Sequence, residues 1–152
     1  MLTQQEISDR FEIQDLIFHY ADCIDRRNFD ELVNVFTEDA DIDYTAVGGP
    51  SGKRSEIIDF LKKALTAFKT YQHLNANVQI RVNGDTATGR VMCFNPSDLK
   101  LGGGKTHLFM IGIWYNDTYV RTPQGWRIQR RAEEKSWAFN LPDFMTLGEK
   151  NS

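Results

Sequence analysis

The sequence predicts an α+β fold in which a curved antiparallel sheet packs on three helices from the N-terminal half of the chain. Apart from one early strand, apolar residues recur at helical spacing up to Phe68, and from Leu74 onward they alternate with polar residues. Asn83-Gly84, between two alternating runs, is the dipeptide typical of a two-residue hairpin turn. Helices and strands that occupy separate parts of a chain favour α+β over a parallel α/β sheet.

Three helices are predicted, two of them opened by a capping box. Thr3 and Glu6 predict the start of the first helix, which should end near Arg27. Asn28 and Glu31 predict the start of a short helix over "FDELVNVF". The apolar stripe of the first helix is Ile13, Leu16, Ile17, Tyr20, Ala21 and Ile24. The stripe of the third is Ile57, Ile58, Leu61, Ala64, Leu65 and Phe68.

Five strands are predicted from alternating polarity. The first is "DIDYTAV" at 41–47, and the others cover residues 74–82, 86–94, 106–121 and 126–139. "NPSDLKLGGGK" at 95–105 is predicted to be a loop and "TPQG" at 122–125 a turn. Residues 1–140 should form one domain, and residues 141–152, which show no pattern, a loosely ordered tail.

Composition excludes several classes of protein. The net charge of −3, with no basic cluster, argues against a nucleic-acid partner. No apolar run approaches the ~20 residues of a membrane span, and the polar start "MLTQQEISDRFE" predicts no signal peptide. Cys23 and Cys93 are far apart and lack the spacing of metal ligands, so the sequence predicts a reduced, cytoplasmic protein without a metal site.

The strand at 106–121 also predicts self-association. Both parities of "HLFMIGIWY" are apolar, and a strand that is apolar on both faces is buried on both. One face should meet the helices and the other a second copy of the chain. We therefore expect a homo-oligomer, a dimer or trimer, joined through the sheet by one of two sets: Phe109, Ile111, Ile113, Tyr115 and Tyr119, or their neighbours of opposite parity.

Three stretches resemble a known family. They are "YADCIDRRNFDELVNVFTEDADIDY", "HLNANVQIRVNGDTATGR" and "GIWYNDTYVRTPQGWRIQRR", with the spacings His73-x-x-x-Asn77 and Tyr115-x-Asp117. The chain resembles the SnoaL-like polyketide cyclase and scytalone dehydratase group of the nuclear-transport-factor-2-like superfamily over about residues 5–140. The resemblance implies a cone-shaped, cystatin-like sheet with an internal pocket.

The resemblance also implies an acid–base pair. Asp25 matches the aspartate that such enzymes carry on the first helix, and His73 matches their histidine near the start of a strand. From the residues alone, Asp25 would be a partner of Arg26 or Arg27, or a local cap, and a carboxylate in the last turn of a helix is disfavoured by the helix dipole. An Asp–His pair suits proton transfer near neutral pH.

Further pocket residues are predicted with less support from the residues themselves. Tyr20 and Tyr44 match pocket tyrosines of the family and would hold a substrate carbonyl; as aromatic core residues they would need no such role. Strand parity separates Arg130 from Arg131, a bulge would exchange their faces, and one of them would face the cavity unless both are solvated. The full set of predicted pocket residues beyond the catalytic four is Phe18, Phe36, Cys93, Asn95, Arg130 and Arg131.

These features together predict a lyase or isomerase of the dehydratase or cyclase type that works without a cofactor. Its substrate would be a small hydrophobic carbonyl compound that is polyketide-, steroid- or aromatic-like. One departure weakens the match to dehydratases, because the strand after the hairpin carries Met92, Cys93 and Asn95 where some members have a second histidine. The alternative is a non-catalytic binding or structural subunit, such as the small subunits of ring-hydroxylating dioxygenases, which share this fold.

Overall fold

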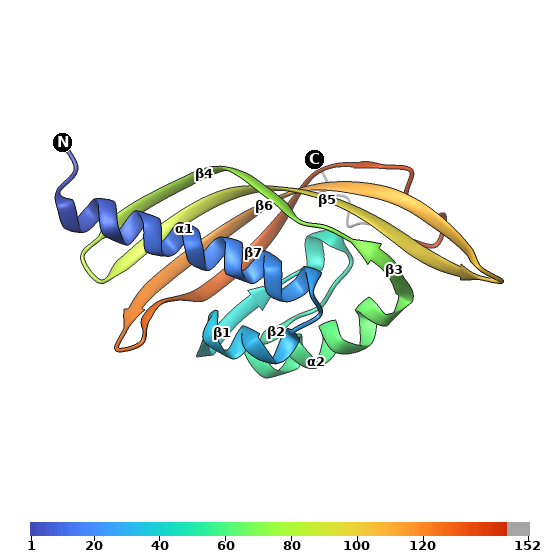
Figure 1. The fold of residues 1–152 in the computed structure, drawn as a ribbon, viewed down its shortest axis with the longest axis horizontal. Helices are drawn as coiled ribbons and strands as arrows, with labels where there is room; N and C mark the ends of the chain where they lie inside the picture. The colour runs from blue at the N-terminus through green and yellow to red at the C-terminus, as the bar shows by residue number, and fades with distance from the viewer. Residues whose placement is uncertain (146–152) are drawn as a thin grey trace.

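One long helix and a strongly curved sheet make up most of the molecule (Figure 1). The structure is a computed structural model, and it describes residues 1–145. The helices are α1 (Gln4–Asp25) and α2 (Arg54–Ala64), with 3₁₀ turns η1 (Phe29–Asn34), η2 (Thr45–Val47) and η3 (Leu65–Ala67). The strands are β1 (Phe36–Asp43), β2 (Ser51–Lys53), β3 (Phe68–Tyr71), β4 (Leu74–Asn83), β5 (Thr86–Gly102), β6 (Lys105–Thr122) and β7 (Gly125–Phe139).

The sheet confirms the α+β fold and adds one parallel pair. Its order is β2-β1-β7-β6-β5-β3, with β4 also paired to β5. β1 runs parallel to β7, with Asp43 opposite Ala132, and every other pair among residues 1–145 is antiparallel. The sheet is therefore mixed rather than purely antiparallel, because β1 joins it from the helical half of the chain.

The prediction of a loop at 95–105 is wrong for most of that segment. β5 continues to Gly102 and stays paired with β6, as Leu99 opposite His107 and Gly102 opposite Lys105 show. Ser97 and Leu99 are buried at alternate positions, which is the pattern of a strand. Only residues 103 and 104 form the turn between β5 and β6, and this hairpin projects beyond the rest of the sheet in Figure 1.

The ends of α1 follow from local hydrogen bonds. The predicted capping box of Thr3 and Glu6 is present. At the other end Arg27 is left-handed with φ of 59°, and the Asn28 N–H donates to the Cys23 carbonyl at 2.8 Å, which is a Schellman motif. The second predicted capping box is wrong, because Asn28 makes no side-chain cap bond and η1 is a 3₁₀ helix.

A break in one edge of the sheet positions His73. β3 pairs with β5 at Ser97 and Leu99, and β4 pairs with β5 from Phe94 onward, so both strands lie along the same edge of β5. Residues 72 and 73 lie between them and belong to neither strand. The backbone N–H of His73 is therefore released from the sheet and can bond to another element.

The helices cover the concave side of the sheet. α1 packs on β4 and β7, and α2 packs on β1 and β2. Leu141 and Met145 also pack on the core, whereas residues 146–152 of the predicted tail lie outside the described residues. Within residues 1–145, no helix has the length and the apolar character that crossing a membrane requires.

Candidate active site

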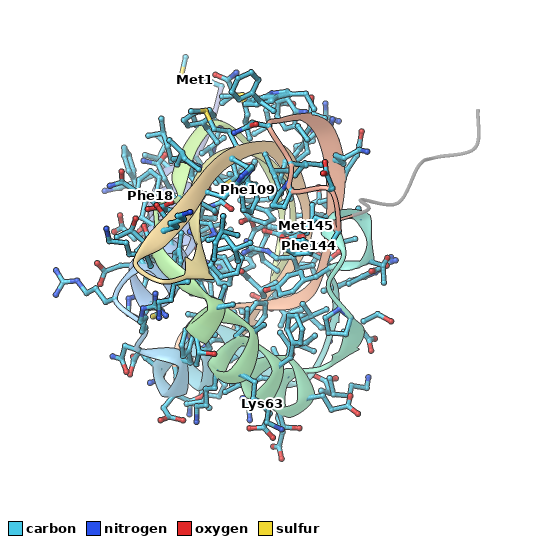
Figure 2. The ribbon with its side chains drawn as sticks, turned by 90° about the vertical axis from the view of Figure 1, so that its right-hand side faces the viewer. Met1, Phe18, Lys63, Phe109, Phe144 and Met145 are labelled. Carbon is cyan, nitrogen blue, oxygen red and sulfur yellow. The ribbon has the colours of Figure 1, made fainter. Side chains whose placement is uncertain are left out.

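A cavity of about 260 Å³ lies between the helices and the concave face of the sheet. Most of its lining is apolar and includes Phe109 and Met145, both labelled in Figure 2. The polar residues of the lining are Tyr20, Tyr44, Tyr71, His73, Asn95, Ser97 and Glu133. A small concave site with a few polar groups in an apolar wall is typical of a small-molecule site.

Asp25 and His73 are joined by two hydrogen bonds. The His73 ring nitrogen Nδ1 lies 2.7 Å from Asp25 Oδ1, and the His73 backbone N–H donates to Asp25 Oδ2 at 3.0 Å. The predicted contact is therefore present. A carboxylate accepts hydrogen bonds only, so in the neutral ring this pairing favours the tautomer with its proton on Nδ1 and Nε2 free to accept one. His73 lines the cavity and Asp25 lies behind it.

The position of Asp25 at the end of α1 is explained by His73. The negative end of the helix dipole disfavours a carboxylate there, and the two N–H groups of His73 offset that cost. Neither nearby arginine pairs with Asp25: Arg26 bonds to Asp22 at 2.8 Å, and Arg27 donates to the carbonyls of Leu65 and Phe68. The carboxylate is thus committed to His73 rather than to an arginine.

Tyr20 and Tyr44 meet inside the cavity. Their hydroxyl oxygens lie 2.7 Å apart. Burial raises the pKa of Tyr20 to about 12 and raises that of Tyr44 well above its usual value, so both hydroxyls keep their protons at neutral pH. One hydroxyl donates to the other, which leaves one O–H of the pair to donate to a ligand.

The sequence model of the SnoaL-like domain family matches residues 5–132. The chain belongs to the SnoaL-like domain family. Protein Rv2910c of Mycobacterium tuberculosis is 49% identical to it over 135 residues, which cover 89% of this chain and 90% of that protein.

Two solved structures are similar to this SnoaL-like chain along nearly its whole length. A candidate scytalone dehydratase from Novosphingobium aromaticivorans is 19% identical with a TM-score of 0.83, and the match covers 99% of both chains. The type 3 LinA hexachlorocyclohexane dehydrochlorinase of Novosphingobium barchaimii is 18% identical with a TM-score of 0.77, covering 94% of this chain and 97% of its own. At these identities the two likenesses show a shared fold.

Three predicted pocket residues of the SnoaL-like domain lie away from the cavity, whereas Asn95 lines it. Phe18 is 42% exposed and lies at the outer side of the molecule in Figure 2, because it falls off the apolar stripe of α1. Phe36 is buried behind Tyr20, with the two rings edge to face at 5.8 Å. Cys93 is also buried in the core, outside the lining.

The two arginines of β7 lie on opposite faces, and neither lines the cavity. Thr118 pairs with Arg130 whereas Tyr119 pairs with Ile128, so Gln129 is a bulge residue that exchanges the two faces of the strand. Arg130 is therefore exposed on the outer face, and Arg131 is fully buried on the inner one. The bulge that the sequence analysis allowed for is present. Arg131 nevertheless lies behind the residues that line the cavity and is not part of its wall.

Arg131 supports the tyrosines from behind. Its guanidinium donates two hydrogen bonds to Asp117, at 2.7 and 2.8 Å. It also lies over the rings of Tyr20 and Tyr115, with its central carbon 4.2 and 4.0 Å from the ring centroids. A charge that is paired and stacked in this way fixes the tyrosine ring that faces the cavity.

Glu133, like Tyr71 and Ser97, is a polar residue of the lining that the sequence did not single out. It lies two residues after Arg131, so the same bulge turns it inward. Its Oε2 atom is buried and has no hydrogen-bond partner within residues 1–145. Burial raises the pKa of the Glu133 carboxyl to about 8, against the opposing attraction of Arg131. In the sequence, Glu133 is marked only by lying two residues after Arg131, and therefore on the same face of the strand. That face can be assigned to the inside of the molecule only when the bulge at Gln129 is known.

Glu133 should make stability depend on pH. The unfolded chain releases this proton above its ordinary pKa of 4.5, whereas the folded chain holds it to about 8. Between these values the free energy of unfolding should therefore fall as the pH rises, by about 1.4 kcal/mol per pH unit from this group. Glu133→Gln should remove that dependence and be more stable than wild type at pH 8. Urea unfolding at pH 5, 6, 7 and 8 measures the free energy of unfolding of each protein. Glu38→Gln, on the exposed face of β1, is the control. The same dependence of this free energy on pH in wild type and Glu133→Gln would contradict the prediction.

The described part of the chain contains no cluster of side chains that could bind a metal ion. No group of three His, Cys, Asp or Glu residues within residues 1–145 is arranged to hold a metal ion. The polar groups of the cavity are instead arranged as a hydrogen-bonded acid–base pair, a tyrosine pair and a carboxyl group. That set can remove a proton from a bound molecule and stabilise negative charge on an oxygen.

Proposed function

We propose that this protein is a cofactor-independent lyase or isomerase of the dehydratase or cyclase type that moves a proton on a small hydrophobic carbonyl compound. The observation that carries the proposal is the Asp25–His73 pair, which opens through His73 onto an apolar cavity. The candidate scytalone dehydratase and the hexachlorocyclohexane dehydrochlorinase, whose names describe eliminations, share the fold and support this class of reaction.

His73 acts as the base in this proposal. Its Nε2 takes a proton from the carbon next to the substrate carbonyl, and Asp25 stabilises the imidazolium that forms. The negative charge moves to the carbonyl oxygen, where the free O–H of the Tyr20–Tyr44 pair donates to it. Asp25 is thus a positioning residue, and His73 and the two tyrosines are the catalytic ones.

The size and lining of the cavity favour a compact substrate. About 260 Å³ lies just below the range of ~300–1,000 Å³ that drug-sized ligands occupy. Within residues 1–145, the apolar wall offers no cationic group for a phosphate or a carboxylate ligand, because His73 is paired with Asp25 and Arg131 lies behind the tyrosines. A ring ketone of the polyketide or aromatic type, with one or two fused rings, fits this description better than a larger steroid.

The non-catalytic alternative has less support. A purely structural subunit needs no open cavity, and its interior would be filled by aromatic side chains. Here the interior keeps its space although Phe60, Phe68 and Phe109 line it. A carboxylate that orients a histidine ring and fixes its tautomer is useful for proton transfer, whereas binding a ligand does not need it.

A bicyclic β-hydroxy ketone tests the proposal. 3-Hydroxy-1-tetralone loses water to give an enone that tautomerises to 1-naphthol, whose fluorescence reports the reaction. The protein should accelerate this reaction above the buffer rate, equally with and without EDTA, because no metal takes part. No acceleration above buffer at any pH from 6 to 8 would contradict the proposal.

We further propose that the partner of the outer sheet face is a second copy of the chain. Leu108, Trp137 and Phe139 are 51%, 43% and 62% exposed there, and Phe94 packs against Trp137 with ring centroids 5.8 Å apart. The other parity of β6, including Phe109, faces the helices, as a strand apolar on both faces requires. Phe94 and Trp137 thus form an apolar contact on this face, and exposed apolar patches are typical of interaction sites.

Light scattering at micromolar concentration should therefore give the mass of a dimer or trimer. The double variant Trp137→Glu, Phe139→Glu should shift it towards the monomer, because it buries charge in the contact. The matched control is Glu38→Gln, which lies on an exposed part of β1. A wild-type monomer at these concentrations would contradict the proposed assembly.

A further inference from the structure

We propose that Glu133 is a second catalytic residue of the cavity, the acid that protonates a departing hydroxyl group. This inference rests on the proposed function and deepens it. Among residues 1–145, Glu133 carries the one carboxyl group in the lining of the cavity, and the mechanism proposed above gives it no role.

The topology places Glu133 across the cavity from His73. Glu133 lies on β7, opposite Tyr115 of β6, and His73 lies at the break between β3 and β4. β6 and β5 separate the two sites in the sheet, which amounts to three strand spacings of about 4.8 Å each along a strongly curved surface. Both side chains line the same small cavity, so a ligand that fills it touches the two of them at once.

The Oε2 atom of Glu133 has an unmet hydrogen-bonding capacity. It is buried and lacks a partner within residues 1–145. Buried polar atoms are nearly always bonded, and an exception calls for a ligand or a functional role. A substrate hydroxyl beside this atom would supply the missing bond.

The surroundings of Glu133 keep its proton in place at neutral pH. The groups that face it are Arg131 on its own strand, Asp43 of β1, Asp117 of β6, and the neutral side chains of Tyr20, Tyr44, Tyr115 and Cys93. Arg131 is already paired with Asp117, and Asp43 and Asp117 oppose further negative charge. Burial then raises the pKa of the carboxyl to about 8, so it is a proton donor at pH 7.

The step balances in protons and electrons. The C–H bond next to the carbonyl breaks, its proton goes to His73 Nε2, and its electron pair forms the new C=C bond. The C–O bond to the hydroxyl breaks, and the departing oxygen takes the proton of Glu133 to become water. The imidazolium and the Glu133 carboxylate that remain are reset when one proton passes between them through solvent. A chloride leaves as a stable anion and needs no such donor.

A leaving-group comparison tests this assignment. 3-Hydroxy-1-tetralone and 3-chloro-1-tetralone give the same enone, and only the first needs an acid. Glu133→Gln keeps the shape and can still donate a hydrogen bond, but it cannot transfer a proton. We expect kcat for the hydroxyl compound to fall by about 10²-fold or more, and kcat for the chloride, after subtraction of the buffer rate, to stay unchanged. Glu38→Gln is the matched control and should leave both unchanged.

Two further measurements keep the outcomes distinct. On the wild-type protein, kcat for the hydroxyl compound should fall tenfold per pH unit above about pH 8, and kcat for the chloride should not. Exchange of the α-hydrogens of 1-tetralone in D₂O needs the base alone. If the wild type fails to exchange them, the proposed function itself is lost. If it exchanges them and Glu133→Gln slows neither substrate, or slows both equally, only the assignment of Glu133 is overturned.

Discussion

Replacing His73 with glutamine should lower kcat for 3-hydroxy-1-tetralone by about 10²- to 10⁴-fold, the range expected for loss of a general base. Glutamine fills a similar volume, and its backbone N–H can still donate to Asp25 Oδ2. What disappears is the unprotonated Nε2 atom, the one nitrogen of the pair that is available to a ligand in the cavity. Steady-state kinetics on folded protein, checked by circular dichroism and thermal unfolding, measure the loss.

His19→Gln is the matched control for this variant. His19 lies on the same helix as Asp25, but its side chain is 43% exposed and contacts Glu31 rather than the cavity. Its replacement should leave kcat within the error of the assay. Wild-type kcat in His73→Gln would show that the base is another group.

Asp25→Asn should lower kcat by about 10²-fold or more, through the tautomer of His73 rather than through any contact with substrate. Asparagine has one acceptor oxygen for two donors. When that oxygen stays on the backbone N–H of His73, its NH₂ group faces Nδ1, which must then become an acceptor. The ring proton moves to Nε2, and the atom that should accept the substrate proton already carries one.

Nitrogen NMR of His73 separates this mechanism from simple unfolding. We expect the neutral ring to carry its proton on Nδ1 in the wild type and on Nε2 in Asp25→Asn. Asp22→Asn is the control, because Asp22 is exposed, pairs with Arg26 and should leave both the tautomer and kcat unchanged. An Asp25→Asn protein that loses activity with the wild-type tautomer intact would contradict the positioning role.

The parts of the fold that depend on local pattern were predictable from the sequence. The capping box of Thr3 and Glu6, the stripe of α1 and the β4–β5 hairpin follow from short-range spacing, although the two turn residues are Gly84 and Asp85 rather than Asn83 and Gly84. The β5 extension was missed because Gly102 to Gly104 drew the whole segment 95–105 into a loop, whereas pairing with β6 keeps residues 95–102 extended. Tertiary pairing overrode local composition there.

The site was predictable only in part, and the reasons differ from residue to residue. Asp25 and His73 were found because a family resemblance named both positions, although 48 residues separate them in the chain. Phe18 was misplaced because its apolar character was given more weight than its position off the helical stripe. Arg131 and Glu133 depend on the bulge at Gln129, and no residue type in β7 signals an irregularity that pairing with β6 creates.

Exchange of the α-hydrogens of 1-tetralone in D₂O, followed by proton NMR, tests most directly the claim that His73 and Asp25 remove a proton from a bound carbonyl compound. It needs neither a leaving group nor knowledge of the natural substrate. We predict that the wild-type protein exchanges these hydrogens faster than buffer and that His73→Gln exchanges them at the buffer rate. Equal exchange by wild type and His73→Gln, or wild-type exchange no faster than buffer, would contradict it.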